Sequence, residues 1–179
     1  MNIRLILVPV DFSTCSLLVT RQAASLAAKL GAKVLVLHVA ELPSGMNTGS
    51  KVQDHGQERP VEEVLRTDAE ARLQDFAAEA RAQGAEVEVQ VALGPIVATI
   101  LSVTEAVQAD LMVIGTHGRT GLARAMLGSV AEEVARRAHV PVMLVRRESR
   151  PECARQSCEW CPHDGRSPVE VHVAAESEG

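Results

Sequence analysis

Three glycines and one serine have the spacing of an anion-binding loop. Gly115 ends an aliphatic segment, Gly118 follows three residues later, and Gly128 directly precedes Ser129 at the start of a predicted helix. The backbone N–H groups of such a loop and the N-terminus of the helix can converge on phosphate oxygens. Glycines after a strand are also common in plain turns, so the spacing alone leaves a turn as the alternative.

A second group of residues with ligand chemistry lies near the C-terminal end. Cys153, Cys158, Cys161 and His163 supply soft and borderline metal ligands, and the C-x2-C step is common in structural zinc sites. The step from Cys161 to His163 is unusually tight, so His172 is an alternative fourth ligand. A redox-active cysteine pair and a tail with reactive thiols are the other interpretations. Zn²⁺ binding in this tail is therefore a hypothesis.

Composition argues against several classes of protein. Among 179 residues, 18 are Lys or Arg and 23 are Asp or Glu, a balance that disfavours a protein that grips a phosphate backbone. Aromatic side chains are limited to Phe12, Phe76 and Trp160, so stacking platforms for single-stranded nucleic acid are missing. No apolar stretch approaches the ~20 residues that span a bilayer, and the N-terminus lacks the pattern of a signal peptide. We expect a cytoplasmic protein without nucleic-acid or membrane partners.

Aliphatic and amphipathic segments alternate along residues 1–146, and this pattern indicates strands and helices in turn. Such alternation requires right-handed crossovers and a parallel sheet with helices on both faces. The sequence therefore predicts a doubly wound, five-stranded α/β domain over residues 1–146, a long polar loop over 41–60, and an appended tail over 147–179. The predicted strands are 3–10, 33–39, 86–93, 110–114 and 141–146, and the predicted helices are 14–30, 61–81, 95–108 and 128–138.

Strand order decides where a ligand would bind, because ligands of open α/β sheets lie where the order reverses. Order 2-1-3-4-5 places that crevice between strands one and three. Order 3-2-1-4-5 places it between strands one and four, beside Asp11 and Gly115, and the glycines favour this second order. Strand five then forms one edge of the sheet. Its unpaired backbone groups would be satisfied by the same strand of a second copy, so we expect a homodimer.

The segment GTHGRTGLARAMLGSVAEEV resembles the nucleotide-binding motif of the universal stress protein family. The similarity includes LILVPVDFS, LHV and VPVMLV and covers about residues 1–146. The resemblance implies an ATP-binding α/β domain, usually a homodimer, that acts in stress adaptation rather than as a dedicated catalyst. It also implies that the phosphates lie along Gly115, Gly118, Gly128 and Ser129, with Mg²⁺ expected to bridge them.

The same resemblance implies roles for residues near the first two strands. Pro9, Val10 and Val39 correspond to positions around the adenine, and the carboxylate of Asp11 would accept a hydrogen bond from a ribose hydroxyl. Asp11 also precedes a predicted helix, where a helix cap is the alternative role. Arg119 lies between the glycines and could reach a phosphate or be a solvated loop charge.

The predicted function is that of an ATP-binding stress-response protein, a nucleotide-responsive switch or binding module. The chain has neither a Walker-type G-x4-G-K-(S/T) motif nor a G-x-S-x-G elbow, so dedicated catalysis is not expected and weak ATP hydrolysis stays open. One alternative is a nucleotide-free stress protein that works through its dimer surface and its tail. A flavin-binding electron carrier is another, disfavoured because neither Phe12 nor Phe76 falls on the predicted loop.

Overall fold

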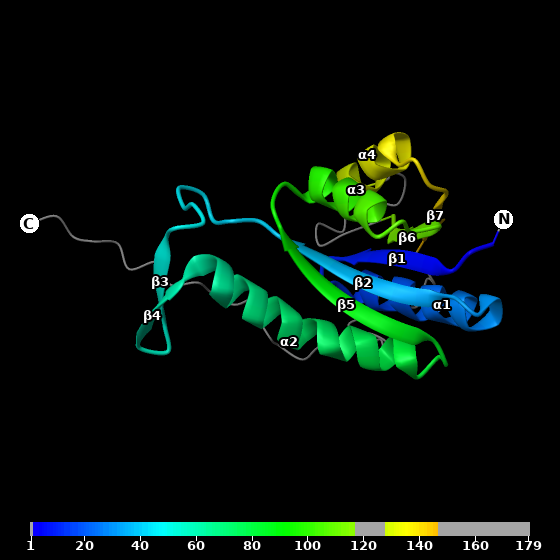
Figure 1. Ribbon diagram of the computed structural model, residues 1–179, viewed down its shortest axis with the longest axis horizontal. Helices are drawn as coiled ribbons and strands as arrows, with labels where there is room; N and C mark the ends of the chain where they lie inside the picture. The colour runs from blue at the N-terminus through cyan, green and yellow to red at the C-terminus, as the bar shows by residue number, and fades with distance from the viewer. Residues whose placement is uncertain (1, 117–127, 147–179) are drawn as a thin grey trace, which may run out of the picture.

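The main sheet has the strand order that the glycines favoured. The computed structural model describes residues 2–116 and 128–146. Five parallel strands form this sheet: β1 (Leu5–Val10), β2 (Lys33–Ala40), β5 (Glu86–Leu93), β6 (Leu111–Gly115) and β7 (Val142–Val145). Their order is β5-β2-β1-β6-β7, which is 3-2-1-4-5 when these strands are numbered along the chain. The order therefore reverses between β1 and β6 (Figure 1).

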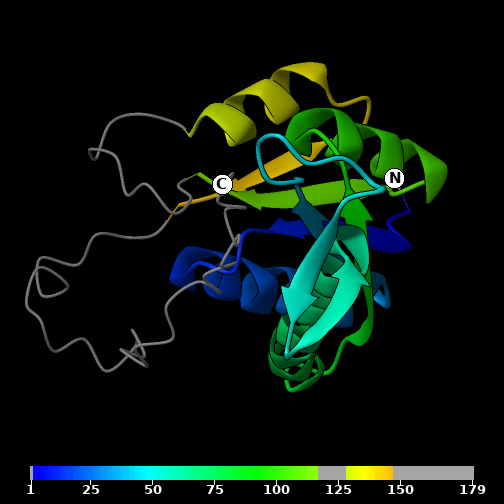
Figure 2. The ribbon, with the colours of Figure 1, turned by 90° about the vertical axis from the view of Figure 1, so that its left-hand side faces the viewer.

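Helices cover both faces of the sheet, as Figures 1 and 2 show. Val8 of β1 packs with Leu73 in the core on one face, and Leu7 packs with Ile100 in the core on the other. Successive residues of a strand point to opposite faces, so a strand buried on both sides is aliphatic throughout. The prediction of a doubly wound α/β fold is confirmed. On the first face lie α1 (Thr14–Leu30) and α2 (Val61–Arg81), and on the second lie α3 (Ile96–Ala106) and α4 (Ser129–Arg137).

Local signals in the sequence explain where α1 begins and ends. The side chain of Ser13 accepts a hydrogen bond from the backbone N–H of Ser16 and caps the N-terminus. Gly31 ends the helix in the left-handed conformation, with φ of 66°. The chain can then enter β2 directly, which runs parallel to β1 up to the pair Val10 and His38. Both strands consequently end at the same edge of the sheet.

The polar stretch 41–60 contains a hairpin where a loop was expected. β3 (Lys51–Asp54) and β4 (Gln57–Pro60) pair antiparallel and form a separate sheet beyond the N-terminal end of α2 (Figures 1 and 2). His55 and Gly56 both have positive φ, 49° and 80°, as the two central residues of a type I′ turn require. Val52 anchors the hairpin by packing with Val61 and Val64 of α2.

The remaining boundaries differ from the predicted ones by a few residues. Pro95 and Gly128 precede their helices as N-cap residues and do not occupy the first helical turn. Among the helices of the described part of the chain, none is both long and apolar enough to cross a membrane.

Candidate functional site

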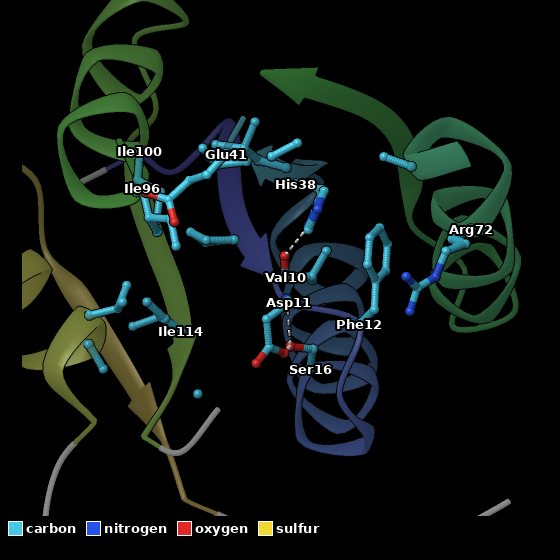
Figure 3. A pocket seen from close by; sticks show the side chains of 18 of the residues that line it. Val10, Asp11, Phe12, Ser16, His38, Glu41, Arg72, Ile96, Ile100 and Ile114 are labelled. Carbon is cyan, nitrogen blue, oxygen red and sulfur yellow. Dashed lines mark hydrogen bonds between the residues drawn. The ribbon is translucent and has the colours of Figure 1, made fainter. Parts of the chain in front are cut away.

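A cleft of about 610 Å³ opens at the carboxyl ends of β1, β2 and β6, where the strand order reverses (Figure 3). Helix α2 contributes to its wall from one face of the sheet, and α3 and α4 contribute from the other. The position agrees with the rule for ligand sites in open α/β sheets. The cleft is thus the first place to look for the predicted residues.

Most of the residues predicted for the nucleotide site come together in this cleft. Those that line it are Pro9, Val10, Asp11, Val39, Gly115, Gly128 and Ser129. Gly118 and Arg119 lie outside the described residues, and so do the predicted metal ligands Cys153, Cys158, Cys161 and His163. Their placement stays a prediction. Within residues 2–116 and 128–146, no group of three or more His, Cys, Asp and Glu side chains could hold a metal ion.

One part of the cleft is an apolar slot. Ile96 of α3, Ile114 of β6 and Val39 of β2 line it, and Leu37 and Ile100 pack there with almost no exposed surface. Val39 is 9% exposed, so it offers only a small area to a ligand. A slot of this kind suits a flat, apolar ligand group such as a nucleobase, since burial of its faces removes apolar surface from water.

Asp11 occupies the turn that follows β1 and is held by hydrogen bonds. Its Oδ1 accepts from the backbone N–H of Ser13 at 3.0 Å and from the hydroxyl of Ser16. The backbone N–H of Asp11 in turn donates to Ser16 Oγ at 3.1 Å. The alternative of a capping role near the helix N-terminus therefore describes part of what Asp11 does. The residue also lines the cleft, so capping and ligand contact are compatible.

The N-terminus of α4 borders the cleft beside the end of β6. The backbone N–H of Gly128 donates to the Thr116 carbonyl at 2.8 Å. The backbone N–H of Thr116 in turn donates to the Val145 carbonyl at 3.0 Å. Gly128 is the N-cap residue, and within the described residues no side chain caps this helix. The first N–H groups of a helix have no partner within it, and they carry the positive end of the helix dipole. This border of the cleft can therefore receive an anion.

A cluster around Phe12 was missed in the sequence. Phe12 lines the cleft from the turn after β1 rather than from the predicted loop, so an aromatic side chain is present at the site. Its ring centroid is 4.1 Å from that of His38, and the Arg72 guanidinium carbon is 4.0 Å from the Phe12 centroid. His38 is itself held by a hydrogen bond, because its Nδ1 lies 2.9 Å from the Val10 carbonyl oxygen. The sequence gives no direct indication of this cluster, because Arg72 is far from Phe12 along the chain. The two side chains meet only in the folded protein.

The comparisons with known proteins bear on the whole sheet and the cleft. A family model described as the universal stress protein family matches residues 2–146. The chain belongs to the universal stress protein family. A relative from this family, the universal stress protein MJ0531 of Methanocaldococcus jannaschii, is 30% identical over 142 residues, which cover 79% of this chain and 81% of the relative.

Solved structures of universal stress proteins share the fold. One, a universal stress protein in complex with cAMP, is 25% identical with a TM-score of 0.62, and the match covers 82% of this chain and 98% of that one. Another, from Archaeoglobus fulgidus in complex with dAMP, is 27% identical with a TM-score of 0.56 over 80% of this chain and 98% of that one. Both ligands of these family members are adenine nucleotides.

Proposed function

We propose that this universal stress protein is a nucleotide-binding module that takes ATP in the cleft between β1 and β6. The observation that carries the proposal is the combination, in one cleft, of the apolar slot, the Asp11 carboxylate and the N-terminus of α4. These three parts match the three parts of a nucleotide. The base enters the slot around Val39, a ribose hydroxyl donates to Asp11, and the phosphates approach Gly128 and Ser129. The relatives solved with cAMP and dAMP support an adenine base.

Mg²⁺ in this proposal bridges phosphate oxygens of the bound ATP. Mg²⁺ in nucleotide sites keeps several waters and needs only one or two protein oxygens, so a preformed cluster of protein ligands is not required. Dedicated catalysis is not part of the proposal. Binding and release of ATP would act as a stress-responsive switch, in the cytoplasmic setting that the sequence leads us to expect.

Calorimetric titration with Mg²⁺ and ATP tests the proposal through Gly128→Val. Gly128 has φ of −61° and ψ of 143°, a backbone conformation that valine adopts readily, so the variant is expected to fold. The added side chain would stand between the phosphates and the first N–H groups of α4. We expect ATP affinity to fall by about tenfold or more, the equivalent of losing ~1.4 kcal/mol of charge-assisted hydrogen bonding.

Ala135→Val is the matched control for that variant. Ala135 belongs to the same helix, is exposed and does not line the cleft. The Ala135→Val protein should therefore bind ATP with the affinity of the wild type. Unchanged affinity in a folded Gly128→Val protein would contradict the proposal. A nucleotide-free stress protein would instead show no binding by the wild type.

Flavin is the second candidate, and Phe12 is the observation that brings it back. The Phe12 ring has contacts with both His38 and Arg72, which leaves little room for a stacked isoalloxazine. We therefore retain ATP as the ligand. Purified protein that carries the visible absorbance of a flavin would reverse this choice.

We further propose that two copies pair through β7. Met143 and Leu144 are 41% and 40% exposed, and β7 forms the edge of the main sheet. The carbonyls of Pro141 and Val145 accept hydrogen bonds from the β6 side, so the backbone groups of Leu144 face the outer edge. Leu144→Pro would remove one outward N–H without breaking the pairing with β6. Light scattering should show a wild-type dimer and a Leu144→Pro monomer, whereas a monomeric wild type would contradict the proposal.

Zinc binding by Cys153, Cys158, Cys161 and His163 stays a prediction. Elemental analysis of protein purified without chelator should give about one zinc per chain, lost in Cys158→Ser. Metal-free wild-type protein with titratable thiols would contradict it.

A further inference from the structure

The Phe12 ring is enclosed by side chains from three other positions in the fold. The His38 ring from β2 and the Arg72 guanidinium from α2 contact it at centroid distances of 4.1 and 4.0 Å, and Figure 3 shows Phe12 between them. Phe76 of α2 makes an edge contact with the same ring, with centroids 5.7 Å apart. The two nearer neighbours, His38 and Arg72, therefore hold this side chain next to the cleft.

The backbone of Phe12 needs such restraint. Its φ is 63°, in the left-handed region that L-residues other than glycine, asparagine and aspartate rarely adopt. A residue in this conformation persists where the surrounding structure holds it, and such residues gather at functional sites. The contacts of the ring supply that restraint, because the Phe12 side chain can reach His38 and Arg72 only when the turn is formed.

His38 restrains the same turn from the other side. Its Nδ1 lies 2.9 Å from the Val10 carbonyl oxygen, and because a carbonyl only accepts, Nδ1 carries the proton. Val10 is the last residue of β1 and lies opposite His38 in the sheet register. The His38 ring thus contacts both neighbours of Asp11 in the chain, Val10 through a hydrogen bond and Phe12 through its ring.

Asp11 is therefore held between two anchored residues. Its own hydrogen bonds to Ser13 and Ser16 orient Oδ1 toward the start of α1. The backbone of Val10 and Phe12, on either side, therefore determines where Asp11 lies relative to the cleft. A small rotation of the turn would displace the carboxylate from any ligand above it, even if the bonds to Ser13 and Ser16 were kept.

We propose that Phe12, clasped by His38 and Arg72, is a positioning residue that places the Asp11 carboxylate for the ribose hydroxyls of a bound nucleotide. The inference rests on the proposed function, since it assigns the origin of the ribose contact in that site. It predicts a specific defect when the ring is removed: the protein loses its preference for nucleotides that carry ribose hydroxyls and keeps its affinity for the rest of the ligand.

The experiment compares ATP with 2′,3′-dideoxy-ATP by calorimetry in the presence of Mg²⁺. Wild-type protein should bind ATP about tenfold or more tightly than the dideoxy analogue, because a hydroxyl donating to a carboxylate is a charge-assisted hydrogen bond. In Phe12→Gly the left-handed φ stays accessible, but the contacts of the ring with His38 and Arg72 are lost. We expect the preference to fall to about threefold or less, while affinity for the dideoxy analogue changes by less than about twofold.

Two further variants separate positioning from general packing. Phe76→Leu removes the edge contact but leaves the His38 and Arg72 contacts, so the preference for ATP should match that of the wild type. In an Asp11→Asn background, adding Phe12→Gly should cause no further loss of preference, because the two changes remove one interaction. Phe12→Leu serves as a second ring-removing variant if Phe12→Gly does not fold.

The outcomes are distinct. A wild type that binds both nucleotides equally leaves ATP binding in the cleft intact but removes the ribose contact of Asp11, and so overturns the role of Phe12. A wild type that binds neither nucleotide overturns the proposed function as well. A retained preference in Phe12→Gly, or an equal loss in Phe76→Leu, also overturns the assignment. Loss confined to the ring-removing variants and absent from Phe76→Leu supports it.

Discussion

Replacement of Arg66 and Arg81 by methionine is expected to lower the free energy of unfolding by about 2 kcal/mol and to open a strand edge to aggregation. Both arginines extend from α2 to β5, the strand at the edge of the main sheet opposite β7. Arg66 Nη1 donates to the Val91 carbonyl at 3.1 Å, and Arg81 Nη2 donates to the Val87 carbonyl at 3.2 Å. The two guanidinium groups therefore cover part of the edge.

The register shows that these carbonyls belong to the outer side of β5. The backbone N–H of Gly94 donates to the Ala40 carbonyl of β2 at 3.0 Å. Backbone groups of alternate residues point to the same side of a strand, so those of Val87 and Val91 point away from β2. Each arginine bond is worth about 1 kcal/mol net, and two bonds far apart on α2 should add. Methionine retains much of the apolar stem, so the loss reports mainly on the hydrogen bonds.

Urea unfolding of the double variant, together with light scattering over time, measures both effects. The matched control is Arg136→Met with Arg137→Met, which removes the same two charges from α4. Those side chains are 69% and 51% exposed and pair with Glu132 and Glu133 one turn away. Exposed pairs of this kind contribute about 0.3–0.5 kcal/mol each, so the control should lose less than about 1 kcal/mol. Equal unfolding midpoints and equal scattering in the two double variants would refute the reasoning.

Two other perturbations follow from hydrogen bonds and backbone geometry. Backbone N–H groups of Arg4 and then Leu5 donate to the Asp110 carboxylate, at 2.8 and 3.0 Å, and lower its pKa. A lowered folded-state pKa stabilises the fold above the unfolded-state pKa, and this contribution is lost as pH falls through the folded-state pKa. The stability difference between wild type and Asp110→Asn should therefore shrink on acidification, and denaturant titrations that give a constant difference would contradict it. Gly94 has φ of 140°, and a Cβ there would lie 2.8 Å from Thr99 Oγ1, so Gly94→Ala should cost about 1–3 kcal/mol in thermal unfolding; an unchanged midpoint would count against it.

Much of the sheet follows from patterns that the sequence displays. Residues 86–93 alternate polar and apolar side chains, a pattern typical of a strand with one solvated face, and β5 lies at the edge of the sheet. Gly115 and Gly128 favoured the correct strand order, since glycines after a strand are needed where a backbone approaches a ligand. These signals are local in the sequence, and they come from elements long enough to show a clear pattern of polar and apolar residues.

The β3–β4 hairpin and the Phe12 cluster could not be predicted from local sequence patterns. β3 and β4 have four residues each, with Val52 as the only aliphatic side chain, so their pairing depends on the turn at His55 and Gly56 and on packing against α2. No local pattern in the sequence indicates the partners of Phe12. Its partners His38 and Arg72 are brought to it by β2 and α2, and a contact between such distant positions exists only in the folded sheet.

The charges along the cleft would orient an anionic ligand in one direction. Glu41 follows β2 and Asp68 belongs to α2, so the β2 side of the cleft carries two carboxylates, with the Arg72 guanidinium of α2 also in the lining. The N-terminus of α4 lies on the β6 side, and Asp11 after β1 lies between the two sides in the strand order. Phosphates are repelled by carboxylates and attracted by a helix N-terminus. A nucleotide with its phosphates toward α4 therefore places them at the helix N-terminus and away from Glu41 and Asp68, whereas the reverse placement brings them toward those two carboxylates.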